Sequence, residues 1–403
     1  MGHRIRKGYG LLAMLVVSFT SLQAQSNLGE IFNGGVQDAE KLLNAYMAPF
    51  GASLGANLNA GWINTAAPLK PGRFELKMVA NVAFVPTQEQ SYNLDALGFR
   101  NSVERNYQGL SATEQWQYST AVAPTVFGSQ DNTTTITKVL TYQDEVSGQT
   151  ITEEIAELPL PGGLGFSFNP IAPTPQLSVG LPLGTELMGR YLPGVSRSID
   201  NTDIDFSGIW GIGIKHDIKQ WIPGIKRLPF SMSLAVGYSS SEADFSFLPV
   251  VPQAPSGGQF ADPGLAGTAY NGPAPDPATY EGQGVAFRAR AWNVNLLVSK
   301  KVSVLSVYSG LRYAHALTTL RMQGIYGISG DPYLNPDHEN DANNGRYTLI
   351  HTEENPIEVN MPLSQVGLVG GFRLKLAFLS LFAEGNYSKF STVSAGIGFG
   401  WMN

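Results

Sequence analysis

Six charged residues alternate with apolar residues along the chain, in segments of strand-like period. The six are Glu75, Lys77, Arg312, Arg373, Lys375 and Glu384. Alternate side chains of a strand point to opposite faces, so these charges share the face turned away from the apolar one. Charges that face a closed interior must pair. We expect them either to line a pore and set its selectivity or to cross-link a closed lumen, and we favour the cross-linked lumen.

Two arginines lie on the other face of a strand. Arg288 and Arg290 share the face of Trp292, which we expect to lie outside, near the outer rim. The planar guanidinium group binds phosphate through paired hydrogen bonds. Contact with lipopolysaccharide phosphates is therefore a candidate role, although we favour the alternative that these arginines are ordinary rim charges.

One loop carries oxygen ligands at alternating positions. These are Asp337, Glu339, Asp341 and Asn343. A calcium loop requires glycine at its sixth position and a bidentate glutamate at its twelfth, where this chain has Ala342 and Thr348. The run is a weak calcium candidate, and a solvated loop is the default. A second, weaker run is Asp200, Asp203 and Asp205.

Catalytic patterns are missing from the sequence. The five histidines are His3, His216, His315, His338 and His351, and no two have the spacing of a metal pair. The chain has no Gly-x-Ser-x-Gly motif, phosphate loop or dinucleotide glycine pattern. We expect neither an enzyme nor a cofactor.

Composition limits the class of protein. The 403 residues include 45 Gly, 16 Tyr and only 14% charged residues, which favours one large all-β unit with a lipid-facing wall. The absence of cysteine excludes a lipoprotein anchor, disulfides and thiol chemistry. The net charge of -6 disfavours nucleic acid as a partner.

The N-terminus predicts export. Residues 1–25 combine a basic start, a short apolar run and a small-residue cleavage region, as a signal peptide does. In residues 26–55, apolar residues at helical spacing predict a short amphipathic helix over Val36 to Pro49. This helix is either a plug in a barrel lumen or an ordinary surface helix.

From residue 56 to 403 the apolar period is two, which predicts an outer-membrane β-barrel. We expect about twelve antiparallel strands, near 56–64, 73–85, 133–143, 149–157, 175–190, 203–215, 229–240, 284–299, 303–323, 363–377, 379–388 and 392–402. The hairpin at 133–157 is too polar for a lipid face. Outside the wall it would leave ten strands, and an undetected pair would make fourteen.

Connection lengths predict the topology. Lys300-Lys301 and Ala377-Phe378 are expected to be tight turns, whereas 244–280 and 324–345 are expected to be long loops. Barrels of this kind have short periplasmic turns and longer outer loops, so the C-terminus is placed in the periplasm. Residues 86–174 form an irregular insertion without an assigned place.

Three segments carry a resemblance to a known family. They are Asp38-Ala-Glu-Lys-Leu-Leu-Asn-Ala-Tyr-Met-Ala-Pro-Phe50, Gly180-Leu-Pro-Leu-Gly-Thr-Glu-Leu-Met-Gly-Arg-Tyr-Leu-Pro193 and Lys215-His-Asp-Ile-Lys-Gln-Trp-Ile-Pro-Gly-Ile-Lys-Arg-Leu-Pro229. They resemble a family of uncharacterised outer-membrane proteins of Gram-negative bacteria, which implies a barrel and no activity. A looser similarity, in layout only, links the chain to the long-chain fatty acid transporter family. The last strand resembles the terminal signal read by the barrel-assembly machinery, although Met402 and Asn403 follow Trp401.

These observations predict an outer-membrane channel or passive transporter for small molecules, hydrophobic ones included. The alternative is a non-transporting barrel that serves as scaffold or anchor in secretion or adhesion, and a third possibility is a soluble secreted β-protein. The expected partners are outer-membrane lipid, lipopolysaccharide and the assembly machinery. The sequence names no ligand.

Overall fold

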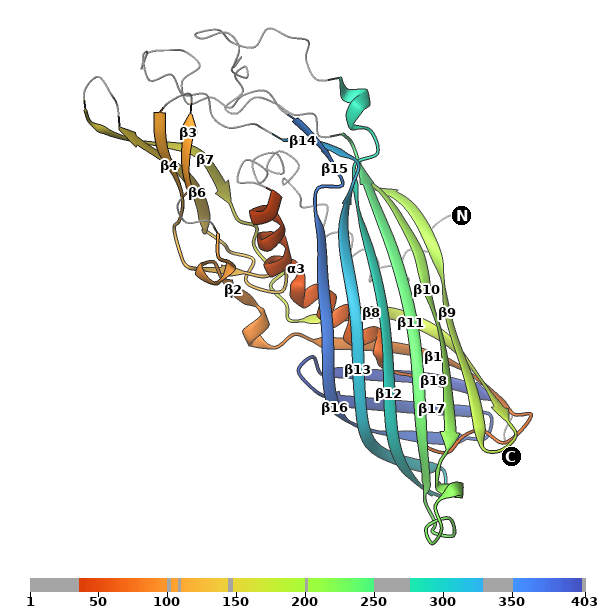
Figure 1. Cartoon of the computed structure of the whole chain (residues 1–403). Helices are drawn as coiled ribbons and strands as arrows, with labels where there is room; N and C mark the ends of the chain where they lie inside the picture. The colour runs from red at the N-terminus through yellow and green to blue at the C-terminus, as the bar shows by residue number, and fades with distance from the viewer. Residues whose placement is uncertain are drawn as a thin grey trace.

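The computed structural model describes residues 36–99, 103–107, 110–143, 148–199, 202–249, 276–328 and 351–400. Ten antiparallel strands close into one barrel, shown in Figure 1. Around the barrel they are β1 (Phe74–Phe84), β18 (Thr392–Gly400), β17 (Leu379–Tyr387), β16 (Glu358–Leu376), β13 (Leu305–Gln323), β12 (Gly284–Val302), β11 (Ser231–Phe247), β10 (Thr202–Asp217), β9 (Thr185–Ile199) and β8 (Phe168–Leu181). One helix, α3 (Val36–Asn59), precedes them.

The wall has its apolar face outside. Along β1, Phe74, Leu76 and Met78 are exposed, whereas Glu75 and Lys77 between them are buried. A water-soluble β-protein shows the opposite arrangement, while a transmembrane barrel requires this one. The chain is therefore a transmembrane β-barrel of the outer-membrane type.

A belt of outward-facing aromatic residues crosses five strands, and we call it the aromatic belt. Its members are Tyr191, Trp210, Tyr238, Trp292 and Tyr313. Tyr191 is paired with Trp210, and Tyr238 with Trp292. Ring centroids are 5.4 Å apart for Trp210 and Tyr238 and 5.3 Å apart for Trp292 and Tyr313. Such belts mark the membrane–water interface.

Beyond this belt charged residues become frequent at the outward positions. Examples are Glu242, Arg288, Arg290, Arg321 and Glu358. From Trp292, β12 continues to Gly284, about 26 Å of strand at ~3.3 Å per residue. The tall strands therefore project out of the membrane.

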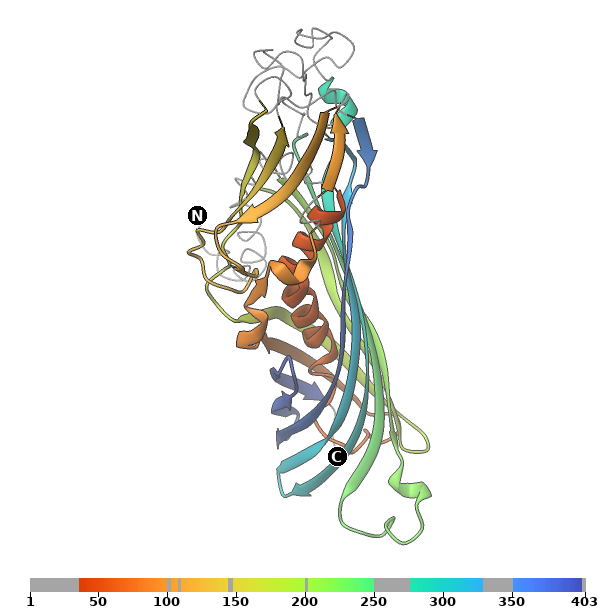
Figure 2. The same ribbon diagram turned by 60° about the vertical axis from the view of Figure 1, so that its left-hand side comes forward.

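Unequal strand lengths divide the barrel into two parts. β1, β17 and β18 have 11, 9 and 9 residues, whereas β12, β13 and β16 have 19 each. We call the part enclosed by all ten strands the ring. The part built only by the tall strands β9 to β13 and β16 is the trough, visible in Figures 1 and 2.

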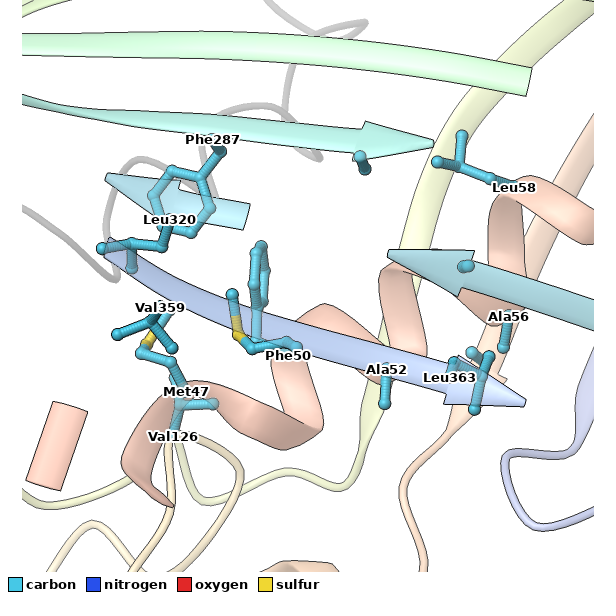
Figure 3. Packing of buried hydrophobic residues seen from close by; sticks show 14 of the residues in the cluster. Met47, Phe50, Ala52, Ala56, Leu58, Val126, Phe287, Leu320, Val359 and Leu363 are labelled. Carbon is cyan, nitrogen blue, oxygen red and sulfur yellow. The ribbon is translucent and has the colours of Figure 1, made fainter. Parts of the chain in front are cut away.

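Helix α3 lies in the trough against the inner faces of β12, β13 and β16. Figure 3 shows Met47, Phe50 and Leu58 of the helix packed among strand residues such as Phe287 and Leu363. Added Cβ atoms at Gly51 and Gly55 would come within 2.5 Å of Met361 and 2.4 Å of Ala316. Small helix residues thus let the helix approach the wall closely.

A second antiparallel sheet, of four strands, is not part of the barrel wall. Its order is β3 (Val103–Tyr107), β4 (Leu110–Tyr118), β6 (Thr135–Gln143) and β7 (Thr150–Pro159). Two short pairs, β2 (Ser91–Asn93) with β5 (Val122–Pro124) and β14 (Ile325–Ile328) with β15 (His351–Glu354), lie among the connections. In Figure 1 the four-stranded sheet lies across α3 from the tall strands.

The strand count of ten lies within the predicted range, but three details of the prediction are wrong. Residues 56–64 are not a strand: they end α3 and enter the lumen, and because all of them are buried, none faces lipid. Residues 175–190 are a hairpin, β8 and β9, with positive φ at Leu183 and Gly184. The alternation of apolar residues continues through this turn, so the sequence pattern does not reveal the turn.

The polar hairpin lies outside the wall, as the ten-strand alternative predicted, and the third error concerns one turn. Strands at 133–143 and 149–157 exist as β6 and β7, but they belong to the separate sheet, as their polar faces allow. The turn placed at Lys300-Lys301 lies instead at Ser303, whose φ is +56°, because both lysines are still paired in β12. The turn at Ala377, with a φ of +53°, is where it was predicted.

The tight turns at Ser303 and Ala377 lie at the same end of the barrel as the last residues of β18 (Figure 1). No helix among the described residues is long and apolar enough to cross a membrane. The predicted signal peptide, residues 1–25, and most of both long loops lie outside the described residues.

Candidate functional site

The inside of the ring is occupied by the chain that follows α3. We call residues 60–69 the plug segment. Its Trp62 and Ile63 are each 1% exposed, and Ala66 is fully buried. They pack against inward residues of the wall, including Met188 and Leu297.

Three buried ion pairs surround the plug segment. Arg373 Nη2 lies 2.7 Å from Glu75 Oε1, and Arg312 Nη2 lies 2.8 Å from Glu384 Oε1. The third joins Lys215 Nζ to Glu186 Oε2 at 2.9 Å. The structure thus places four of the six predicted charges in direct pairs.

The same charged groups bind the backbone of the plug segment. Lys77 Nζ donates to the Trp62 carbonyl at 3.2 Å, and Lys215 Nζ donates to that of Thr65 at 3.3 Å. Glu186 Oε2 accepts from the amide of Leu69 at 2.9 Å. Irregular backbone in a lumen needs such partners, because its polar groups are buried away from water.

Two further contacts anchor the middle of the plug segment. Tyr308 donates its hydroxyl to the Ile63 carbonyl at 3.1 Å and lies 3.0 Å from Glu384 Oε2. Asn64 Nδ2 donates to Glu75 Oε2 at 3.1 Å. Each carboxylate therefore joins the wall and the plug segment in one network.

The Trp62 indole fills a slot shaped for it. The Arg190 guanidinium stacks 3.9 Å from the ring centroid. Arg190 also donates to the carbonyls of Leu58 at 3.3 Å and Ala60 at 3.1 Å. On the facing strands, Cβ atoms at Gly213 and Gly237 would lie 2.9 and 2.8 Å from the indole. Glycine at these two positions makes room for the ring.

This network of charged groups lies inside the ring, against the plug segment. Lys77, Arg312 and Glu384 are each at most 2% exposed, so water barely reaches them. This geometry corresponds to the cross-linked alternative for the predicted charges. Lys375 differs, because it lies half-buried beside the β16–β17 turn, outside the three ion pairs.

Sequence reasoning missed Glu186, Arg190, Lys215 and Tyr308. Lys215 carried a usable signal, since it follows Gly211 and Gly213 on the inward positions of its strand. Glu186 and Arg190 were concealed because the hairpin containing them was predicted as a single strand. Trp62 was missed because its segment was predicted to be a strand.

The remaining candidates lie apart from the ring. Arg288 and Arg290 are exposed on the outer face beyond the aromatic belt, and Arg288 lies 4.0 Å from Glu242. Asp203 and Asp205 accept hydrogen bonds from Ser198 and Ser196 on the neighbouring strand. No group of acidic or histidine residues in the described part of the chain is arranged to hold a metal.

The calcium candidate of residues 337–343 lies outside the described residues. Of the histidines, His315 lies on the outer face beside Trp292, with ring centroids 5.6 Å apart, and bonds Ser364 at 2.9 Å. His216 lies 2.9 Å from Thr185 and accepts from the Trp221 indole at 2.9 Å. His315 thus bonds a neighbouring strand of the wall, and His216 joins the wall to the turn Lys219–Trp221.

An apolar pocket opens in the trough, above the plug segment. Its walls come from α3 and from strands β8 to β12, and its cavity volume is about 90 Å³. The apolar side chains lining it include Phe50, Leu54, Ile171, Leu192, Ile204, Phe206, Ile209, Phe245 and Phe287. This pocket suits a hydrocarbon-like molecule.

Comparison with known proteins gives a family. A model described as "Family of unknown function (DUF6588)" matches residues 6–401. A search of curated proteins gave no match.

Two solved outer-membrane structures are similar. The translocator domain of autotransporter NalP from Neisseria meningitidis is 10% identical, with a TM-score of 0.23, over 86% of this chain and 91% of that one. The outer membrane protease OmpT from Escherichia coli is 9% identical, with a TM-score of 0.24, over 82% of this chain and 97% of that one. Similarity this low carries no inference about activity.

Proposed function

The chain belongs to the DUF6588 family of unknown function, and we propose that it is a passive outer-membrane transporter for small hydrophobic molecules in a Gram-negative bacterium. The apolar pocket is its binding site, and the plug segment keeps the ring from being an open pore. The ligand is identified by its chemistry alone, as a hydrocarbon or a single-chain amphiphile.

The pocket carries this proposal. Every strand that contributes to its lining supplies apolar side chains, and Ser241 and Glu242 of β11 are its polar members; three of the apolar residues are Phe50, Phe245 and Phe287. Phe287 meets Phe50 at 5.6 Å and Phe245 at 5.9 Å between ring centroids, both edge to face. An apolar surface of this kind, left open to solvent beside a filled lumen, gains free energy when a hydrophobic molecule covers it.

The test uses the fluorescent probe N-phenyl-1-naphthylamine with the full-length protein in nanodiscs. Wild type should bind the probe saturably, and Ala289→Trp, which fills the pocket, should bind it at least tenfold more weakly. Val393→Trp is the matched control, because Val393 is 48% exposed on the outer wall. Intact cells of a Gram-negative host should also take up the probe faster with wild type than with Ala289→Trp.

Two results would reject the proposal. One is an absence of saturable binding by wild type. The other is equal uptake by cells carrying wild type and cells carrying Ala289→Trp.

A second candidate function is a scaffold or anchor in an envelope assembly. The four-stranded sheet favours it, because β3 and β7 are edge strands that leave backbone groups for another chain. Deletion of residues 103–159 discriminates between the two functions. Loss of a co-purifying protein with unchanged probe binding would support the scaffold.

A further inference from the structure

The wall of the barrel divides between β8 and β9. These strands pair only from Leu181↔Thr185 to Gln176↔Arg190. Beyond that point β8 continues to Phe168 paired with β1, and β9 continues to Ile199 paired with β10. We call the opening between residues 168–175 and 191–199 the β8–β9 wedge.

Proline occupies both edges of this wedge. Pro170, Pro173 and Pro175 lie on β8, and Pro193 lies on β9. Pairing stops at Gln176, the residue that follows Pro175. If the register continued, Pro173 would stand opposite Pro193. Since proline has no N–H to donate, neither edge can extend the ladder there.

A second wedge, between β16 and β17 on the other side of the trough, is bridged by hydrogen bonds. β16 and β17 pair only from Leu368↔Tyr387 downward, so residues 358–367 of β16 also have a free edge. Here Gln365 Nε2 donates to the Phe390 carbonyl at 3.3 Å, and the Phe390 amide donates to Gln365 Oε1 at 3.0 Å. Helix α3 also packs on this part of β16.

Behind the β8–β9 wedge lies the apolar pocket. Pro170, Ile171 and Ala172 line it from the β8 edge, and Leu192 lines it from the β9 edge. The pocket is thus bounded by the two edges that fail to join. A molecule that passes between these edges meets apolar side chains at once.

The wedge opens at the level of the membrane interface. Its first unpaired residue on β9 is Tyr191, a member of the aromatic belt, 63% exposed on the outer wall. Belts of this kind lie at the lipid headgroups. The opening therefore faces the layer in which amphiphiles and small hydrophobic molecules concentrate.

We propose that the β8–β9 wedge is the port through which the hydrophobic ligand moves between the pocket and the outer interfacial layer of the membrane. This inference rests on the proposed function, because it requires a ligand in the pocket. The prolines keep the port open by preventing the two strands from pairing across it.

The test measures rates as well as affinity. In Pro173→Val/Pro175→Val/Pro193→Val the missing N–H groups return to both edges beside the last β8–β9 pair, and the strands can pair further across the wedge. Association and dissociation of N-phenyl-1-naphthylamine, followed by stopped flow in nanodiscs, should both slow at least fivefold with a Kd within twofold of wild type. Pro362→Val is the matched control, since it adds an N–H to the free edge of β16 on the other side of the trough.

A second variant keeps the port hypothesis testable if the triple variant does not fold. Pro173 and Pro193 are both exposed, and the chain has no other cysteine to interfere with Pro173→Cys/Pro193→Cys. A reducible bis-methanethiosulfonate linker between them should slow exchange, and a reductant should restore it.

The outcomes separate the two proposals. Absence of saturable probe binding in wild type overturns the proposed function. Saturable binding with unchanged rates in the cross-linked or triple variant overturns the port alone. Equal slowing by Pro362→Val also overturns it, because the effect would then belong to strand edges in general.

Discussion

The Arg312 guanidinium reaches across two strand intervals of the lumen to the Glu384 carboxylate, 2.8 Å away. β16 lies between their strands β13 and β17, so this ion pair spans the wall's inner surface instead of joining neighbours. Glu384 also lies 3.0 Å from the Tyr308 hydroxyl, which donates to the plug segment. One carboxylate thus connects two strands and the plug segment.

Removing that carboxylate should be costly. Glu384→Ala leaves Arg312 buried without its ion-pair partner, and breaking a buried pair costs about 3–5 kcal/mol. The free energy of unfolding in urea, followed by heat-modifiable gel mobility, measures the loss. Glu358→Ala removes the exposed partner of Arg321, 3.9 Å away, and should cost about 1 kcal/mol or less. Equal losses in both variants would contradict a network role.

The sequence predicts the wall better than the contents of the barrel. Strand alternation indicates which residues face lipid, as for Phe74 and Glu75, because lipid contact selects every second side chain. The path of residues 60–69 has no such period, since each of their groups meets a different strand. Arg190 and Trp62 form one stack from positions far apart in sequence, and only the closed topology brings them together.

Gly237 should be sensitive to a single methyl group. An added Cβ would come within 2.8 Å of the Trp62 indole, so Gly237→Ala must displace that ring or the plug segment. We expect a loss of about 1–3 kcal/mol in unfolding free energy and more frequent channel openings in planar bilayers. Gly385→Ala is the control, because a Cβ there meets nothing within 4 Å. Unchanged conductance in Gly237→Ala would show that the plug segment does not limit ion flow.

Tyr46 of α3 should make stability depend on alkaline pH. Its hydroxyl donates to the Gly162 carbonyl at 2.9 Å, and burial raises the pKa of Tyr46 to about 12. A free tyrosine has a pKa near 10. Because the folded pKa is the higher one, this contribution is complete below about pH 10 and is lost as pH rises toward 12.

Tyr46→Phe should therefore be less stable than wild type at pH 8, and the difference should shrink between pH 10 and 12. Urea unfolding midpoints at pH 8, 10 and 11 measure this. Other tyrosines also titrate in this range, so the comparison is always between variant and wild type. A constant difference at all three values would rule out Tyr46 as the source.

Arg288 and Arg290 should hold phosphorylated lipid at the outer surface. Both are exposed just beyond Trp292 of the aromatic belt, at the height where headgroup phosphates lie. The carboxylate of Glu242, 4.0 Å from Arg288, competes only weakly at that distance, with both side chains largely exposed. Losing charge-assisted hydrogen bonds of about 1.5 kcal/mol or more should weaken lipopolysaccharide association about tenfold in Arg288→Gln/Arg290→Gln.

Native mass spectrometry of lipopolysaccharide retained by the purified protein measures this association, with heat-modifiable mobility as the check on folding. Lys226→Gln/Arg227→Gln is the matched control, because it removes two exposed charges at the opposite end of the barrel. Since both double variants lower the positive charge equally, a general electrostatic effect would reduce lipid retention in both. Retention reduced only in Arg288→Gln/Arg290→Gln assigns the contact to the outer face of β12, and unchanged retention there rejects it.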